Sequence, residues 1–458
     1  MTPAPGLAEA TVASPLGRIR RVLDLALRDT NVVVATVILT NLFRALSSVV
    51  LTRLLAPEIF GIAGIITAIV FAFSMISDLG FQAFVVRHPD AEKPRFLDTI
   101  WTMAVLRSLT LTSAVFLLAA PIAGAAGKPE LTPIIEASAL IFIIEGTASL
   151  TLLTALRHRQ ILKLSMIDLT VLVVQILLSF LLAYLWRNYW AILVSMLASS
   201  ALKTFMSYVL FPDSVRKPAF DRHYMRELWA FARFVTGSSI ITLILLQSDK
   251  FVFARLMSLD EFGFYILAGN LAAAPFAFTT AYASRVLYPA YSEAWREGKE
   301  DLRAYFYEKR RLPSLLYCFA AGGLIGCAPL IIALLYDPRY APAAIYLQIL
   351  AITPLFALAS YAGNETLTAT GHIKATFQAN LAKLTWFCIA APLGYYLGGV
   401  MGLVVAIALV EIPAVLLKWW QMHRLDYLDI KQELLFLAAG SAGIVVGIAG
   451  DRLLRPFL

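Results

Sequence analysis

Charged side chains are scarce in this chain. Lys, Arg, Asp and Glu make up 15% of its 458 residues, and 60% are apolar, whereas a soluble domain is about a quarter charged and about half apolar. A soluble chain of this length would also divide into two or three domains joined by polar linkers, and the sequence has no such linker. Composition therefore excludes a soluble protein and indicates a membrane protein.

Residues that mark metal, redox and nucleotide sites are also few. The 3 cysteines, Cys318, Cys327 and Cys388, lie within apolar runs, and no two have the spacing of a metal or redox motif. The sequence contains neither a GxxxxGK(S/T) phosphate-binding loop nor an HExxH metal site. We therefore expect no metal, no cofactor and no direct ATP drive. Convergent acid–base groups are missing too, so we expect no enzyme.

Apolar runs long enough to cross a bilayer follow one another almost to the end of the chain. A helix needs about 20 mostly apolar residues to cross the hydrocarbon layer. We therefore predict an all-α integral membrane protein with twelve transmembrane helices and a short thirteenth. The twelve predicted spans are 31–54, 61–86, 98–122, 131–156, 162–186, 189–211, 228–257, 262–290, 313–336, 342–368, 375–397 and 399–420, and the thirteenth run, rich in Gly and Ala, is 434–450.

Lys and Arg residues concentrate in alternate connections between these spans. With the N-terminus in the cytoplasm, the cytoplasmic connections hold most of them, as the positive-inside rule requires. The net charge of +8 is thereby assigned to the membrane surface, and no nucleic acid partner is expected. The first thirty residues leave an interfacial amphipathic helix and an ordinary loop as alternatives. In the helical alternative, one face carries Leu16, Ile19, Leu23 and Leu27.

Two short stretches of the sequence resemble each other. RLLAPEIFG runs from Arg53 to Gly61, and RLMSLDEFG runs from Arg255 to Gly263. Six spans separate them, so both copies cross the membrane in the same direction. Transporters built from such repeats bind substrate near the bilayer midplane, between the two halves. The repeat predicts a cytoplasmic N-terminal segment 1–30, a first lobe 31–211, a cytoplasmic linker 212–227, a second lobe 228–422 and a C-terminal extension 423–458.

These motifs resemble those of the polysaccharide transporter family, the Wzx-like oligosaccharide flippases of the multidrug/oligosaccharidyl-lipid/polysaccharide exporter superfamily. RLLAPEIFG is similar to the family's turn after its first helix, and SDLGFQAFVVR to its Asp-Leu-Gly stretch late in the second. QSDKFVFARLMSLDEFGFY carries the Asp-Lys pair and the second Arg-Leu turn. The resemblance covers about residues 30 to 420. It implies two six-helix lobes around a central cavity lined by helices 1, 2, 7 and 8.

The resemblance also implies a function. Such flippases move polyprenyl-diphosphate-linked oligosaccharides from the cytoplasmic to the outer leaflet of the bacterial inner membrane by alternating access, for surface polysaccharide synthesis. The implied partners are the lipid-linked substrate, membrane lipid, and a polysaccharide polymerase with its export machinery. Two alternatives remain. One is a multidrug or peptidoglycan-precursor transporter of the same superfamily, and the other is a non-transporting scaffold of a polysaccharide assembly complex. Family members have 12 or 14 helices, so a short thirteenth run leaves the side of the C-terminus open.

Ionisable residues inside the predicted spans are functional candidates, because burying them in lipid is costly. Arg44 lies mid-span in the first helix, with no acid at matching depth in the second. Its repeat equivalent is Leu246, one helical turn before Lys250, so each lobe offers one cation. Arginine supplies planar, permanently charged donors for a diphosphate. We therefore expect Arg44 and Lys250 to bind the substrate headgroup.

Other ionisable residues complete the candidate set. Arg107 and Arg285 are further substrate-binding candidates, although Arg285 lies near a cytoplasmic helix end. Asp78 and Asp249 are candidates for coupling transport to an ion, since a buried carboxylate can take up a proton or a sodium ion. Matching depths on neighbouring helices predict three structural ion pairs, Arg107–Glu145, Asp168–Lys203 and Glu365–Lys383.

Overall fold

The computed structural model describes residues 29–372 and 374–457, and within them it forms helices and short connections without a strand. Ten of these helices are long and apolar enough to cross a membrane, or up to twelve if each of two bent pairs is one span. The prediction of an all-α membrane protein is confirmed, and the count of twelve plus one stays a prediction. The predicted amphipathic face at residues 16–27 lies outside the described residues.

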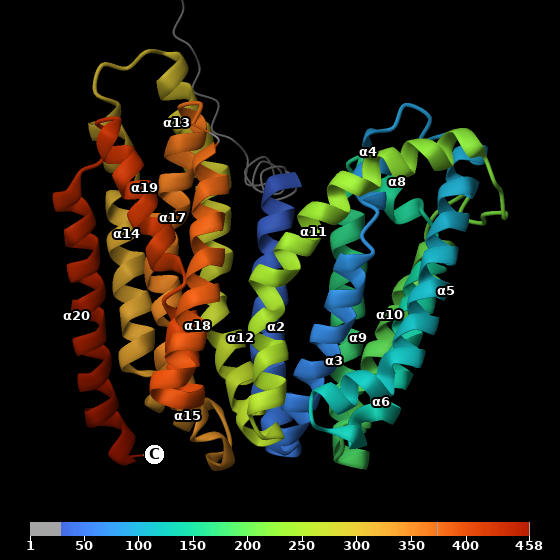
Figure 1. The fold of residues 1–458 in the computed structure, drawn as a ribbon, viewed down its shortest axis with the longest axis horizontal. Helices are drawn as coiled ribbons and strands as arrows, with labels where there is room; N and C mark the ends of the chain where they lie inside the picture. Colours follow the sequence, from blue (N-terminus) through green and yellow to red (C-terminus); the bar gives the residue numbers. More distant parts are fainter. Residues whose placement is uncertain (1–28, 373, 458) are drawn as a thin grey trace, which may run out of the picture.

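The first group of helices forms the right-hand part of Figure 1. Its fourth predicted span, 131–156, is broken, since Pro129–Gly146 and Thr151–Arg157 meet at 55°. The helices of this first lobe are α2 (Asp29–Leu54), α3 (Pro57–Ile76), α4 (Phe81–Arg87), α5 (Pro94–Ala125), η1 (Pro129–Leu131), α6 (Thr132–Ser138), α7 (Leu140–Gly146), α8 (Thr151–Arg157), α9 (Ile161–Trp186) and α10 (Trp190–Val209).

The second group forms the left-hand part, and α2 and α11 stand between the two groups (Figure 1). Its helices are α11 (Arg222–Leu256), α12 (Leu259–Tyr282), η2 (Ala283–Leu287), α13 (Tyr288–Arg296), α14 (Leu302–Gly326), α15 (Ala328–Leu335), η3 (Pro338–Tyr340), α16 (Ala343–Leu350), α17 (Ile352–Ala369), α18 (Lys374–Ala408), α19 (Glu411–Arg424), α20 (Ile430–Leu454) and η4 (Arg455–Phe457).

A glycine pair splits the long helix α18. Gly398 and Gly399 have non-helical backbone angles, and Gly399 has a φ of 57°, which glycine adopts without strain. The segments before and after this pair lie side by side, because the Trp386 indole N–H donates to the carbonyl oxygen of Ala406 at 2.8 Å. The chain therefore reverses at the glycines, between the two predicted spans 375–397 and 399–420.

Helix α20 is longer than the predicted run 434–450, since it extends from Ile430 to Leu454. It lies against α14, and glycines allow the close approach: a Cβ at Gly322 would collide with the carbonyl oxygen of Gly440, and one at Gly326 with that of Ile444. Such small-residue seams are typical of helix contacts in membranes. Its C-terminal end lies at the end of the molecule opposite the start of α2 (Figure 1).

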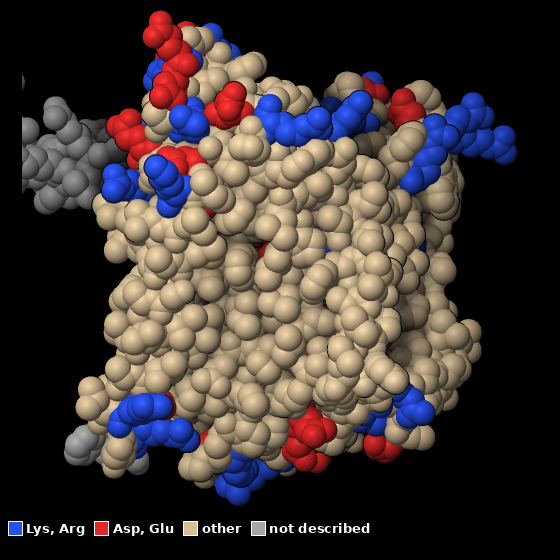
Figure 2. Space-filling model, turned by 60° about the vertical axis from the view of Figure 1, so that its left-hand side comes forward, with Lys and Arg blue, Asp and Glu red and all other residues tan. Residues whose placement is uncertain are grey.

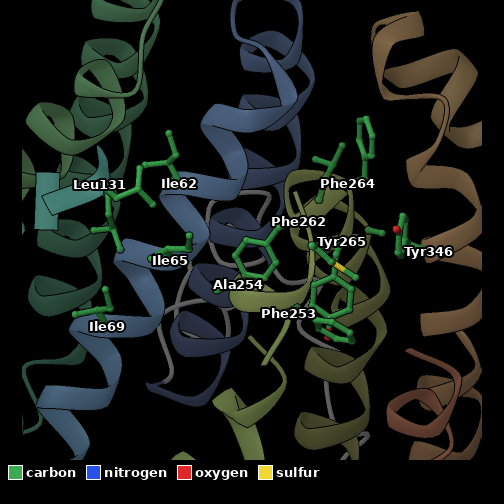
Figure 3. Close-up of a cluster of buried hydrophobic side chains, with 14 of the residues drawn as sticks. Ile62, Ile65, Ile69, Leu131, Phe253, Ala254, Phe262, Phe264, Tyr265 and Tyr346 are labelled. Carbon is green, nitrogen blue, oxygen red and sulfur yellow. The ribbon is translucent and has the colours of Figure 1, made fainter. Parts of the chain in front are cut away.

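The two lobes meet at the lower end of Figure 1, where α2 ends and α3 begins, and the first half of α11 also packs against the first lobe near the upper end. The repeated turns pack against each other at the lower end. A Cβ at Gly61 would collide with the carbonyl oxygen of Leu259, and one at Gly263 with that of Pro57. Buried apolar residues extend this contact. In Figure 3, Phe262 of α12 lies against α3 near Ile65, whereas Ile62 lies beside Leu131. The repeat therefore builds the contact between the lobes at the lower end.

Hydrogen bonds between the lobes reinforce the lower end. The Tyr340 hydroxyl donates to the carbonyl oxygen of Leu55 at 2.9 Å. From the first lobe, the Lys128 ammonium donates to the carbonyl oxygens of Ala254 at 2.5 Å and Met257 at 3.0 Å. These bonds involve backbone oxygens near helix ends, which lack helical partners. The structure is therefore closed at its lower end.

Charged side chains form two bands on the surface. Figure 2 shows Lys, Arg, Asp and Glu gathered at the upper and lower ends, with a belt of uncharged residues between them. Many large apolar side chains are exposed, among them Leu117 at 74% and Leu397 at 75%. A soluble protein rarely exposes an apolar belt of this size to water, whereas such a belt is stable in contact with lipid tails. The chain is a multi-pass membrane protein.

Candidate functional site

The first hollow lies between α2, α9 and α10 and has a volume of about 520 Å³. Arg44 lines it together with Asp168 and Lys203, whose side chains form an ion pair at 2.8 Å. The prediction of that pair is confirmed. Among the described residues no acid lies within 4.0 Å of the Arg44 guanidinium. The lining of this hollow therefore holds two cations and one acid, beside the amides of Asn41 and Gln175.

The second hollow lies between α11, α12, α16 and α17 and has a volume of about 310 Å³. Asp249 and Lys250 both line it, yet they bind different neighbours. The Tyr265 hydroxyl donates to Asp249 Oδ2 at 2.5 Å, and the Lys250 ammonium donates to Gln247 Oε1 at 2.8 Å. Neighbouring helix positions point apart. The sequence placed Arg44 and Lys250 in one cavity, but here they line separate hollows.

The third hollow, of about 740 Å³, lies between the first lobe and α11, and its lining includes Asp78, Arg107 and Glu145. The predicted Arg107–Glu145 ion pair is wrong for this structure, since the described residues show no such pair within 4.0 Å. Arg107 instead donates to the carbonyl oxygens of Ser77 at 2.7 Å and Ser74 at 3.0 Å. These carbonyls lie at the end of α3, where helical partners are missing. The guanidinium therefore holds the end of α3.

Asp78 lies in the break between α3 and α4. Its Oδ1 accepts the N–H of Gly80 at 2.8 Å, and Gly80 has a φ of 68°. From α11, the Ser239 hydroxyl donates to Asp78 Oδ2 at 2.8 Å, and that of Thr236 donates to the carbonyl oxygen of Asp78 at 2.6 Å. The Asp-Leu-Gly motif therefore interrupts the second span and attaches it to α11. Periodicity alone predicted an unbroken span at 61–86.

Arg285 lies apart from these three hollows. It belongs to η2, a short π-helical segment, and is exposed. A π-helical turn inserts one residue into a helix. The four substrate-binding candidates therefore occupy four different places in this conformation, one in each hollow and one on η2.

The second lobe contains charged groups that are almost fully buried. The Lys383 ammonium pairs with Glu411 at 2.5 Å, so the predicted Glu365–Lys383 pair is wrong. The Lys418 ammonium donates to the carbonyl oxygen of Ser360 at 2.9 Å. A prediction from depth pairs residues only on spans that are neighbours in the chain. The helix that lies across from Lys383 is α19, and that pairing follows from the reversal at the glycines.

Arg310 and Glu433 form a second buried pair that sequence reasoning missed. Both partners are nearly inaccessible, and the Tyr307 hydroxyl also donates to Glu433 Oε1, at 2.7 Å. The sequence placed Arg310 in a cytoplasmic connection and Glu433 just outside the thirteenth run. The presence of an acid beside a short apolar run was the available signal for this pair. The residues that the structure describes contain no group of three or more His, Cys, Asp or Glu fit to hold a metal.

Comparison of the sequence with known proteins gives a consistent result. A family model described as "Polysaccharide biosynthesis protein" matches residues 50–345. The chain is 23% identical over 393 residues to the lipopolysaccharide biosynthesis protein WzxC of Escherichia coli (strain K12), covering 85% of this chain and 79% of that protein. It is 25% identical over 261 residues to the succinoglycan biosynthesis transport protein ExoT of Rhizobium meliloti (strain 1021), covering 56% and 51%.

Solved structures share the fold. The lipid II flippase MurJ, in an inward closed conformation, superposes with a TM-score of 0.67 at 14% identity, covering 92% of this chain and 98% of that one. An inward-facing multidrug resistance MATE family transporter of the MOP superfamily gives 0.63 at 12%, covering 84% and 94%. Such identities establish the fold alone. The predicted fold class is confirmed, whereas the predicted bounds of the two lobes stay a prediction.

Proposed function

The chain belongs to this polysaccharide biosynthesis protein family, and on that premise we propose that it is a flippase for polyprenyl-diphosphate-linked oligosaccharides. It carries them from the cytoplasmic to the outer leaflet for surface polysaccharide synthesis. The relatives WzxC and ExoT are named for polysaccharide synthesis and transport. They favour this substrate over a drug or a peptidoglycan precursor. WzxC and ExoT are similar in sequence, whereas the transporters of those other substrates share only the fold.

The observation that supports an anionic substrate best is the composition of the first hollow. Asp168, the one acid among the described lining residues, pairs with Lys203, which leaves Arg44 without an ion-pair partner in the described structure. A diphosphate supplies the missing negative charge and accepts the planar donors of arginine. The amides of Asn41 and Gln175 lie in the same hollow and suit sugar hydroxyls.

Alternating access assigns roles to Lys250, Asp249 and Asp78. With the lower end closed, Lys250 and Asp249 line a hollow of the second lobe, and both become available to the substrate when the lobes rock. Asp249 binds the Tyr265 hydroxyl, and Asp78 binds α11, so that uptake of a proton or a sodium ion at either carboxylate would weaken a contact made by α11 or α12. These two acids are the proposed coupling sites.

The upper end is the proposed cytoplasmic end. The connections there hold the basic residues that positive-inside orientation predicts for the cytoplasm, including Arg95, Arg216 and Lys299. The N-terminus then lies in the cytoplasm and the end of α20 on the outer face of the bacterial inner membrane. A polysaccharide polymerase is the proposed downstream partner.

Transport in proteoliposomes tests the function directly. A fluorescent lipid-linked oligosaccharide is placed in both leaflets, and its exposure to an external sugar-modifying reagent is followed. Wild-type protein is expected to move it, whereas Arg44→Ala should lower the rate tenfold or more, since charge-assisted hydrogen bonds contribute about 1.5–3 kcal/mol. Arg53→Ala, at the exposed end of the same helix, is the matched control.

Two results would overturn the proposal. If the wild-type protein moves no lipid-linked sugar in proteoliposomes, the protein is a scaffold. If Arg44→Ala transports at the wild-type rate, the first hollow is not the headgroup site.

A further inference from the structure

A fourth hollow lies at the upper end of the second lobe, and the transport proposal does not use it. Its volume is about 710 Å³, and it lies between the end of α17 and the facing surfaces of α18 and α19. Lys374 lines it from α18 and Arg424 from α19, and none of the described residues that line it is acidic. A hollow with two cations and no acid favours an anionic ligand.

Each of the two helices carries a basic residue at this hollow and exposed apolar residues below it. On α19, Arg424, Trp420 and Leu416 follow at intervals of four residues and share one helical face. The Arg424 guanidinium lies 4.7 Å from the centre of the Trp420 ring, and both Trp420 and Leu416 are more than half exposed. On α18, exposed Leu381 lies two turns below Lys374.

This order corresponds to the layers of a phospholipid. Basic groups meet the phosphate, an indole belongs at the interface, and leucines meet the acyl chains. An amphiphile therefore fits the surface better than a free anion does, because a free anion would leave the exposed apolar stripe without a partner.

A side-chain amide with a buried oxygen adds a polar group to the hollow. Gln421 donates to Gln378 Oε1 at 2.6 Å, which joins α18 and α19 beside the hollow. Gln421 Oε1 is buried and, within residues 29–372 and 374–457, accepts no hydrogen bond. A buried acceptor without a donor costs about 1–3 kcal/mol. A headgroup hydroxyl would supply that donor.

We propose that this hollow is a binding site for an anionic glycerophospholipid with a hydroxylated headgroup, namely phosphatidylglycerol. Its phosphate lies between Lys374 and Arg424, its glycerol reaches Gln421, and its acyl chains cover Leu381 and Leu416. The bound lipid holds the α18–α19 hairpin at its open end, opposite the reversal at Gly398 and Gly399. The site is separate from the substrate hollows, so it stands whether or not the protein is a flippase.

Lipid titration of the purified full-length protein in detergent micelles tests the site. Native mass spectrometry measures the dissociation constants for phosphatidylglycerol and for phosphatidylcholine of the same chain length. We expect tighter binding of phosphatidylglycerol, and we expect Lys374→Gln/Arg424→Gln to weaken it roughly tenfold. Arg303→Gln/Lys431→Gln removes the same charge from exposed positions of the same end and should leave the constant unchanged.

Three outcomes would overturn the site: equal loss in the control double variant, equal binding of the two lipids by the wild-type protein, or displacement of the lipid by inorganic phosphate or polyprenyl diphosphate. The first would assign the effect to surface charge, and the third to a phosphate or substrate site. Lys374→Gln alone, with about a threefold weaker constant expected, replaces the double variant if that does not fold.

Discussion

The two lobes place their membrane-embedded charges differently. In the first lobe, the side chains of Asp168 and Lys203 are 53% and 46% exposed within a hollow. In the second lobe, the side chains of Arg310 and Glu433 are 4% and 2% exposed, and that of Glu411 is 8% exposed. Both lobes therefore carry ion pairs, but the first keeps its pair accessible and the second encloses its pairs between helices.

The difference in exposure distinguishes charges that bind a ligand from charges that stabilise the fold. An ion pair that is open to water keeps most of its hydration, so either partner can exchange the other for a ligand at small cost. A buried pair has lost its hydration, and removing one partner leaves an unpaired charge in a dry interior. We infer that the charges of the first hollow bind substrate, whereas the buried charges of the second lobe hold α18, α19 and α20 in place.

Removal of Glu433 is expected to have the largest effect. Glu433→Gln leaves the Arg310 guanidinium buried without its counter-charge, which costs about 3–5 kcal/mol of unfolding free energy. Asp168→Asn removes an equivalent acid from the accessible pair and should cost below about 1 kcal/mol. Unfolding in mixed micelles, followed by circular dichroism, measures both.

Replacing both partners completes that test. The double variant Arg310→Met/Glu433→Leu should recover most of the lost stability, because no unpaired charge remains. Equal losses for Glu433→Gln and Asp168→Asn would contradict the comparison between the lobes.

The contact that joins the lobes is expected to give the next largest effect. Gly263→Ala places a methyl group against the carbonyl oxygen of Pro57, and backbone cannot move away without separating α3 from α12. Overpacking of this kind costs about 1–3 kcal/mol, and here it favours an opened lower end. Labelling of a cysteine introduced at Ile62 should become faster. Gly237→Ala on α11, where nothing lies within 4 Å of the added methyl group, should leave labelling unchanged.

Much of the fold was predictable because it depends on local patterns. Apolar run length indicated the spans, and the repeated turn RLLAPEIFG and RLMSLDEFG indicated two parallel lobes. The contact between Gly61 and the second turn is the physical reason for the repeat: two copies of the same turn pack glycine to backbone. The Asp168–Lys203 pair was predicted as well, since α9 and α10 are adjacent in the chain and in space.

The remaining ion pairs depend on which helices lie against each other, and the sequence patterns do not reveal these contacts. Lys383 pairs with Glu411 because the chain reverses at Gly399, whereas the prediction compared Lys383 with the preceding span. Depth alone matches Arg107 with Glu145, but the break at Gly80 leaves carbonyl oxygens at the end of α3 that compete for the guanidinium. Broken helices change which polar groups need partners, and hydropathy does not reveal such breaks.

Lys203 tests whether accessible charge serves transport. Lys203→Gln leaves Asp168 free to pair with Arg44, so that the first hollow loses its excess positive charge. We expect the transport rate to fall about tenfold, equivalent to about 1.4 kcal/mol, with less than about 1 kcal/mol change in unfolding free energy. Lys383→Gln, in the buried pair, should show the reverse: a large loss of stability, and normal transport per folded molecule.

The smallest expected effect asks whether burial, rather than membership of a lobe, explains the comparison. Asp337 and Arg339 pair at 2.8 Å in a connection of the second lobe, with side chains 27% and 50% exposed. The hydrogen bond from Arg339 holds the pKa of Asp337 below its ordinary value. A carboxyl with a lowered folded pKa adds stability above its unfolded pKa of about 4, and that stability is lost as the pH falls through the folded pKa.

The loss should stay below about 1 kcal/mol because the pair is exposed. Unfolding of the wild-type protein and of Asp337→Asn is compared at about pH 6, above the unfolded pKa, and at about pH 3, below it. The difference between the two proteins should be present at pH 6 and should shrink at pH 3. A difference as large as that of Glu433→Gln would show that this lobe's pairs are strong for a reason other than burial, and the comparison between the lobes would then need another cause.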